Sequence, residues 1–161
     1  QPFGEHIGTS FDDVTPLVLA STWGSPEAVQ LLLDAGAATS MEAACGHLPC
    51  HCTGAVMGGK LDNLEVLIKH DPTLATKCGH NAMNALHFTC ERSGPKTKQM
   101  IKLLLDSGAD KSSVNARTEF GETPLYSLCR KAEVLSKDPE VLEVLMEAGA
   151  SLDTGLGSTS G

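Results

Sequence analysis

The chain has 161 residues, enough for one ordinary domain or a short repeat array, and 41% of them are hydrophobic, so a packed core can form. Its net charge of −8 argues against a nucleic-acid-binding protein, which normally presents a basic face. No apolar run approaches the roughly 20 residues that cross a bilayer, so we expect no membrane insertion. Six cysteines are too few for a disulfide-stapled scaffold, which favours free thiols in the cytoplasm, with the nucleus as an alternative.

The first predicted elements are two short helices that follow an N-terminal extension or cap over residues 1–10. The chain begins with Gln1 instead of Met, which suggests a piece of a longer protein. Thr15-Pro16 predicts a helix start, because the Thr hydroxyl caps free N–H groups and Pro at the first helical position loses no hydrogen bond. An amphipathic helix over 28–35 follows and is closed by Gly36, which adopts the left-handed cap conformation at no steric cost.

The same order of signals returns three more times along the chain. Starts fall at positions 15, 48, 84 and 123, so successive starts are 33, 36 and 39 residues apart. The second copy is the weakest and its last helix stops at Asp71-Pro72, because proline has no N–H to donate. The third and fourth copies end in Gly108-Ala109 and Gly149-Ala150, as the first ends in Gly36-Ala37.

These motifs resemble the ankyrin repeat, a unit of about 33 residues with the motif Thr-Pro-Leu-His-x-Ala. The resemblance covers roughly residues 11–153 and implies an all-α fold, an ankyrin repeat solenoid of stacked helix-turn-helix pairs with β-turn tips. The four degenerate repeats would span about 11–42, 43–78, 79–116 and 117–153, with a flexible tail over 154–161. Extra residues around 57–58, 92–98 and 131–139 are expected in loops on one rim of the stack.

A single helix pair cannot bury its apolar face, so stability should come from contacts between neighbouring repeats. The side chains expected to form that core are Leu31, Leu32, Leu33, Leu103, Leu104, Leu105, Val141, Val144 and Leu145. Small residues recur at one equivalent position of the repeats, namely Ser21, Gly54, Cys90 and Cys129, and we interpret the two cysteines as buried packing residues.

The sequence predicts a protein-binding role without catalysis. It has no phosphate-cradling glycine loop, nucleophile elbow or zinc-protease motif, so we expect no enzyme, no cofactor and no small-molecule substrate. Asp12-Asp13 is a pair of carboxylates that turn chemistry explains better than an active site. The resemblance implies that a partner protein binds the turn tips and the concave face of the first helices. By position, the contact residues would be Phe11, Asp12, Val14, Thr22, Trp23, His47, Val56, His80, Asn81, Met83, Glu91, Arg92, Glu119, Phe120, Glu122, Arg130 and Lys131.

Three of these contact residues have alternative interpretations. Trp23 is either an anchor for the partner or a side chain packed under the N-terminal segment. For Phe120, at a predicted tip, contact is favoured over core. Arg130-Lys131 either meets an acidic ligand or belongs to a solvated charged face.

Two further functions stay open. Cys45, His47, Cys50 and Cys52 are dense enough to suggest a zinc or redox site, since thiolate and imidazole are the usual zinc ligands. Their spacing is not a pair of C-x-x-C motifs, and the resemblance gives the positions of Cys50 and His51 structural roles, so we predict no metal there. The chain could instead be the recognition or regulatory fragment of a larger enzyme or channel.

Overall fold

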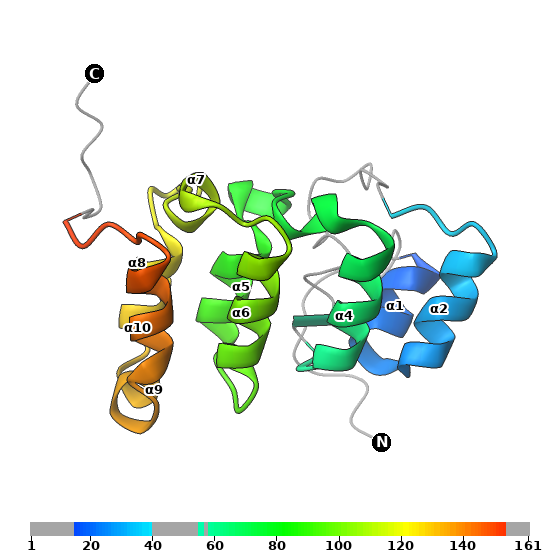
Figure 1. The fold of residues 1–161 in the computed structure, drawn as a ribbon, viewed down its shortest axis with the longest axis horizontal. Helices are drawn as coiled ribbons and strands as arrows, with labels where there is room; N and C mark the ends of the chain where they lie inside the picture. The colour runs from blue at the N-terminus through cyan, green and yellow to red at the C-terminus, as the bar shows by residue number, and fades with distance from the viewer. Residues whose placement is uncertain (1–14, 40–54, 57, 154–161) are drawn as a thin grey trace.

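The computed structural model describes residues 15–39, 55–56 and 58–153, and its elements in these ranges are α-helices and 3-10 helices (Figure 1). They form four helix pairs. Pair one is α1 (Pro16–Trp23) with α2 (Pro26–Asp34), and pair two contains the helical residues 55–56 with α4 (Leu61–His70). Pair three is α5 (Ala85–Arg92) with α6 (Thr97–Asp106), and pair four is α8 (Pro124–Cys129) and α9 (Ala132–Lys137) with α10 (Glu140–Glu147).

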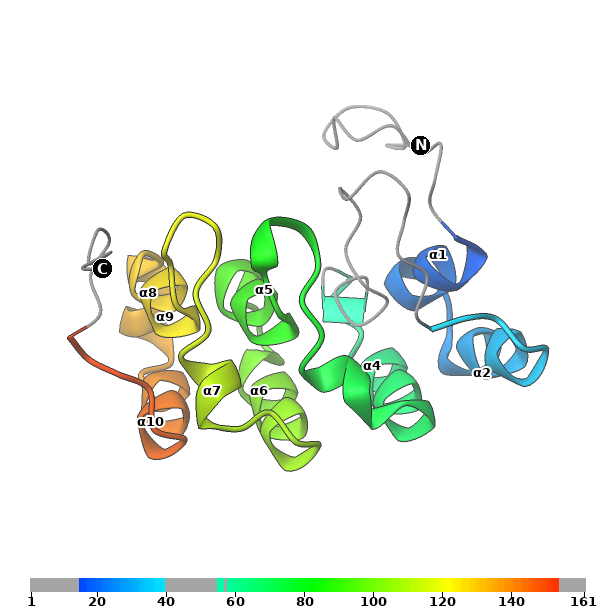
Figure 2. The same ribbon diagram turned by 90° about the horizontal axis from the view of Figure 1, so that it is seen from above.

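The pairs stand side by side in two layers. Figure 2 shows α1, α5 and α8 in one row and α2, α4, α6 and α10 in the other. Each second helix packs on the next one along the chain, and α5 packs on α8 in the first row. The prediction of an all-α solenoid of stacked helix pairs is therefore confirmed. None of the helices in the described ranges is long and apolar enough to cross a membrane.

The helix starts follow the predicted capping chemistry. The Thr15 hydroxyl accepts a hydrogen bond from the Val18 N–H at 3.3 Å, and Thr123 does the same for Tyr126 at 3.2 Å. Pair three has Asn84 where the other two have Thr, and its side-chain oxygen accepts from the His87 N–H at 3.1 Å. An oxygen acceptor at the residue before the helix is thus the shared requirement.

The helix ends follow the predicted glycine chemistry. Gly36, Gly108 and Gly149 all have positive φ, between 85° and 113°. In each case the next residue donates its N–H back into the helix, as Ala37 does to the Leu32 carbonyl at 2.9 Å. This closure turns the chain out of the helix and toward the next pair. In pair two, α4 ends at His70 before Asp71-Pro72, as predicted.

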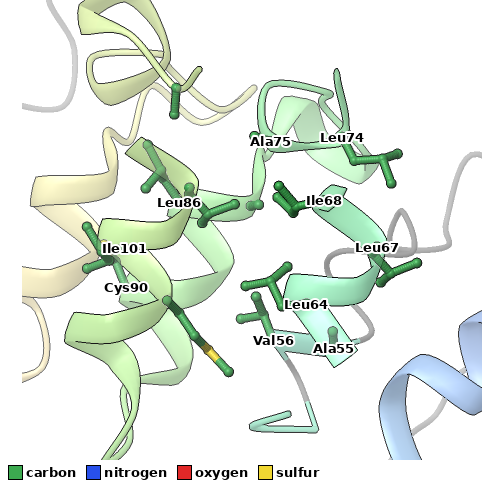
Figure 3. Packing of buried hydrophobic residues seen from close by; sticks show 14 of the residues in the cluster. Ala55, Val56, Leu64, Leu67, Ile68, Leu74, Ala75, Leu86, Cys90 and Ile101 are labelled. Atoms are coloured by element: carbon green, nitrogen blue, oxygen red, sulfur yellow. The ribbon is translucent and has the colours of Figure 1, made fainter. Parts of the chain in front are cut away.

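One continuous apolar core runs through the stack. Leu33, Leu104, Val141 and Leu145 are buried as predicted, and the other predicted core residues apart from Leu31 are partly buried against them. In Figure 3, Leu64 and Ile68 lie on the side of α4 that faces pair three, whereas Leu67 lies on the side toward pair one. Each described second helix between two others therefore contributes to two junctions.

Two predictions for the core were wrong. Leu31 is 69% exposed, because the three leucines in a row span most of a helical turn and only one stripe of α2 can face inward. Cys90 is fully buried, but Cys129 is exposed at the last residue of the short helix α8. Burial raises the pKa of the Cys90 thiol well above its usual range, so that thiol stays protonated.

The extra residues of pair four, expected in a loop on one rim of the stack, form a short helix instead, α9. Short helices also follow the second helices of pairs two and three: the 3-10 helix Pro72–Ala75 and α7 (Lys111–Val114), each capped by an aspartate, Asp71 and Asp110. At the loop before α4, Gly58 lies so close to α1 that a Cβ there would overlap the carbonyl oxygen of Thr22.

Candidate partner-binding surface

The tip before α5 is a tight turn in which two residues that are not glycine have positive φ. Asn81 and Ala82 have φ of 57° and 58° within the 3-10 helix His80–Ala82. The Gly79 N–H donates to the Met83 carbonyl at 2.8 Å, and an isolated antiparallel bridge joins Cys78 to Asn84. Positive φ outside glycine costs free energy, so surrounding bonds must hold this turn in place.

The tip before α8 is organised by Thr118. Its hydroxyl oxygen accepts hydrogen bonds from the N–H groups of Phe120 and Glu122, both at 3.2 Å. The Thr118 N–H donates to the Glu122 carbonyl at 3.0 Å, and Gly121, with φ of 80°, makes the reversal. Thr118 is buried, so the turn is held in place from its buried side. Phe120, in the same turn, is 68% exposed.

The two tips are bonded to each other and to the helices under them. The Glu119 N–H donates to the Asn81 carbonyl at 2.9 Å. His87, fully buried on α5, places its Nε2 3.0 Å from the Ala116 carbonyl and 3.1 Å from the Glu122 carbonyl. Carbonyls only accept, so Nε2 carries the proton and Nδ1 accepts from the Asn84 N–H at 3.2 Å.

Burial lowers the pKa of His87, because the charged imidazolium would lose its hydration. The ring therefore acts as a neutral cross-link between pair three and the tip of pair four. Asn84 adds a second link by donating its Nδ2 to the Ser113 carbonyl at 2.9 Å. These bonds make the tips of pairs three and four one connected ribbon instead of two independent loops.

The predicted contact residues of pair four gather around this ribbon. Arg130 Nη1 donates to Glu122 Oε1 at 2.6 Å across the surface between the tip and the end of α8. Glu119, Phe120, Arg130 and Lys131 are exposed. An exposed ion pair contributes little to stability, so this charge is available to a partner at little cost to the fold.

The remaining predicted contacts are divided between the tips and the opposite end of the helices. Asn81 and Met83 are half-buried in the tip of pair three. Thr22, Trp23, Glu91 and Arg92 lie instead at the ends of α1 and α5, away from the tips; Thr22 is half-buried and the other three are exposed. Phe11, Asp12, Val14 and His47 lie outside the described residues, as does the side chain of His80.

The prediction that Val56 lies at an exposed helix end was wrong. Its side chain is 3% exposed and belongs to the core cluster between pairs two and three. Sequence reasoning missed two supporting residues: Thr118, which organises the tip before α8, and Asn63, whose Nδ2 donates to backbone carbonyls of pair one. A polar residue on the same face of α4 as the apolar Leu64 and Leu67 was the available signal for Asn63.

The possible metal site cannot be placed in this surface. Cys45, His47, Cys50 and Cys52 all lie outside the described residues. Within the described ranges, no group of three or more His, Cys, Asp or Glu side chains could hold a metal ion.

Comparison with known families finds ankyrin repeats in two stretches that together cover most of the chain. A model of three ankyrin repeat copies matches residues 53–155, and a model of the single ankyrin repeat matches residues 12–43. No curated protein matches the chain closely enough to be informative.

Proposed function

Because the chain belongs to the ankyrin repeat family, whose members are generally protein–protein interaction modules, we propose that it binds a partner protein through its turn tips and the concave face of its first helices. We propose further that it does so without catalysis. The described surface offers connected backbone turns and scattered charges, which suit recognition of another protein.

The observation that carries this proposal is the bonded ribbon of tips. Its turns are held by buried Thr118 and His87, so an exposed aromatic side chain, Phe120, stands on a rigid support. A pre-organised aromatic side chain loses little conformational freedom on binding, and such residues often dominate the binding energy of interfaces.

Affinity capture from the native cell tests the proposal. We expect the chain to retain a specific partner and Phe120→Ala to weaken its binding by more than about 1 kcal/mol. The matched control is Leu31→Ala, which removes an equally exposed apolar side chain from the other layer. If both variants bind as the unchanged chain does, the tips are not the contact surface.

A further inference from the structure

Two neighbouring hollows lie where first helices turn into second helices. These turns are at the bottom of the view in Figure 1. One has a volume of about 430 Å³ and is lined by residues from the ends of α1 and the start of α4. The other, of about 290 Å³, lies between the α5–α6 loop and the residues Val56, Gly58 and Gly59. Lys96 lines both, so we treat them as one groove, the foot groove, bounded by Trp23, Lys60, Arg92 and Lys96.

The foot groove is basic although the chain is acidic. Lys60, Arg92 and Lys96 are exposed, and none of them forms an ion pair in the described part of the chain. Asp62 is the one carboxylate among the lining residues of the two hollows. Lys98, next along α6, is already paired with Glu140 of pair four.

Two hollows on the outer layer show the opposite balance. The hollow between α6 and α10 has the carboxylates Asp106, Asp110 and Glu147 against two lysines. The hollow between α4 and α6 has Glu65 and Asp106 against one lysine. Positive charge in the foot groove is thus a local departure from a net charge of −8, and an acidic ligand would be repelled by the outer hollows.

An apolar contact lies beside these cations. Trp23 lines the larger hollow and is 52% exposed, while Val56 and Met100 lie at the base of the smaller one. A half-exposed tryptophan provides a large contact area for an apolar side chain. The lysines at the starts of α4 and α6 also stand where helix dipoles favour anions over cations, so a bound carboxylate would relieve an unfavourable arrangement.

We propose that the foot groove binds an extended acidic segment of a partner protein. Carboxylates of the segment pair with Lys60, Arg92 and Lys96, and an apolar side chain between them lies against Trp23. This surface is separate from the tips, so it supplies a second point of attachment beyond the proposed tip interface.

The only tryptophan of the chain lies in the groove, which gives the test a direct signal. The probe is a short synthetic peptide of glutamate and aspartate around one leucine, titrated while the fluorescence of Trp23 is recorded. We expect saturable binding with a blue shift of the emission, weakened by added salt because exposed charges are screened. A matched peptide of glutamine and asparagine around leucine should not bind.

Charge reversal locates the binding. Lys60→Glu with Lys96→Glu should weaken peptide binding by at least about tenfold, since two attractive contacts become repulsive. The control is Lys69→Glu with Lys102→Glu, which gives the same net charge on the outer layer and should leave the dissociation constant within about twofold. Phe120→Ala should also leave it unchanged, which separates this test from that of the tip interface.

Several results would overturn the proposal. They are no saturable binding of the acidic peptide, equal binding of the amide peptide, or equal loss in the two charge-reversed variants. Tighter binding to anionic lipid vesicles than to the peptide would also reject a protein segment as the occupant. Circular dichroism of each variant confirms that its helices are intact before binding is compared.

Discussion

The junction between pairs three and four and the junction between pairs one and two both contain a buried polar side chain that crosses from one pair to the next. At the first, His87 reaches forward to the carbonyls of Ala116 and Glu122, and each ring nitrogen has a partner. At the second, Asn63 reaches back from α4 and donates its Nδ2 to the Ala20, Ser21 and Gly24 carbonyls at 3.0 to 3.3 Å.

The two differ in how completely the buried group is satisfied. The Oδ1 atom of Asn63 is buried and has no hydrogen-bond partner in the described part of the chain. A buried acceptor without a donor costs free energy and offsets part of what the three Nδ2 bonds contribute. The polar link of His87 should therefore stabilise its junction more than that of Asn63, while the apolar contacts of both junctions should contribute alike.

The apolar contribution is the largest effect expected. Leu67→Ala and Leu128→Ala should each lower the free energy of unfolding by about 2–5 kcal/mol, because each removes a fully buried side chain and leaves a cavity. Urea unfolding measures both, with exposed Leu31→Ala as the control, expected within about 0.5 kcal/mol of the unchanged chain. A large difference between the two core variants would show that the apolar contacts of the junctions are not matched.

The next effect distinguishes the polar links directly. His87→Ala should lower the free energy of unfolding by about 2–3 kcal/mol, since it leaves the buried Asn84 N–H and the Ala116 and Glu122 carbonyls without their partner. The same substitution at exposed His70 should be nearly neutral. A neutral result at position 87 would mean that water replaces the ring without cost.

Asn63→Ala should cost less, about 1–2 kcal/mol, because it removes the donor to three carbonyls but also removes the unpartnered oxygen. The same urea series measures it beside His87→Ala. A loss equal to or larger than that of His87→Ala would contradict the ranking of the two links.

The smallest effect is a dependence of stability on pH. We expect it at the junction of pairs three and four, which contains His87, and not at the junction of pairs one and two, which contains Asn63. The pKa of His87 is below its ordinary value of 6.5 in the folded chain, so the unfolded chain binds a proton more readily. Stability from this residue is complete above pH 6.5 and is lost as pH falls below it. Unfolding measured from pH 7 to pH 5 should show a smaller loss in His87→Ala than in the unchanged chain.

Much of the fold could be predicted because the signals that start and end its helices are local in the sequence. Thr15-Pro16, Thr123-Pro124 and the three Gly-Ala endings act through bonds within one turn of helix, so the residues themselves determine where helices begin and end. Eight of the nine core residues predicted from the apolar period are buried or partly buried, although most of the buried cluster was not predicted. These signals need no knowledge of what lies next to each pair.

The wrong predictions concern residues whose burial depends on the adjacent helix pair. The exposure of Leu31 and Cys129 and the burial of Val56 depend on which stripe of a helix meets the adjacent pair. Similarly, Phe120 could be placed at a tip from its position in the repeat, but the Thr118 and His87 bonds that support it connect segments that are distant in the sequence. Trp23 and Arg92 were predicted as contact residues, but the groove that they form with Lys60 and Lys96 was not, because Lys60 and Lys96 are 36 residues apart and meet only in the stack.

The close approach of Gly58 to Thr22 affects how pair one is oriented on the rest of the solenoid. The atoms that a Cβ at Gly58 would meet all belong to the Thr22 backbone, so no side-chain movement could make room for it. A methyl group added by Gly58→Ala would push the two segments apart and should tilt pair one relative to pair two. Along a row of stacked pairs the displacement caused by such a tilt increases with distance, so Gly58→Ala should move the far end of the stack relative to pair one.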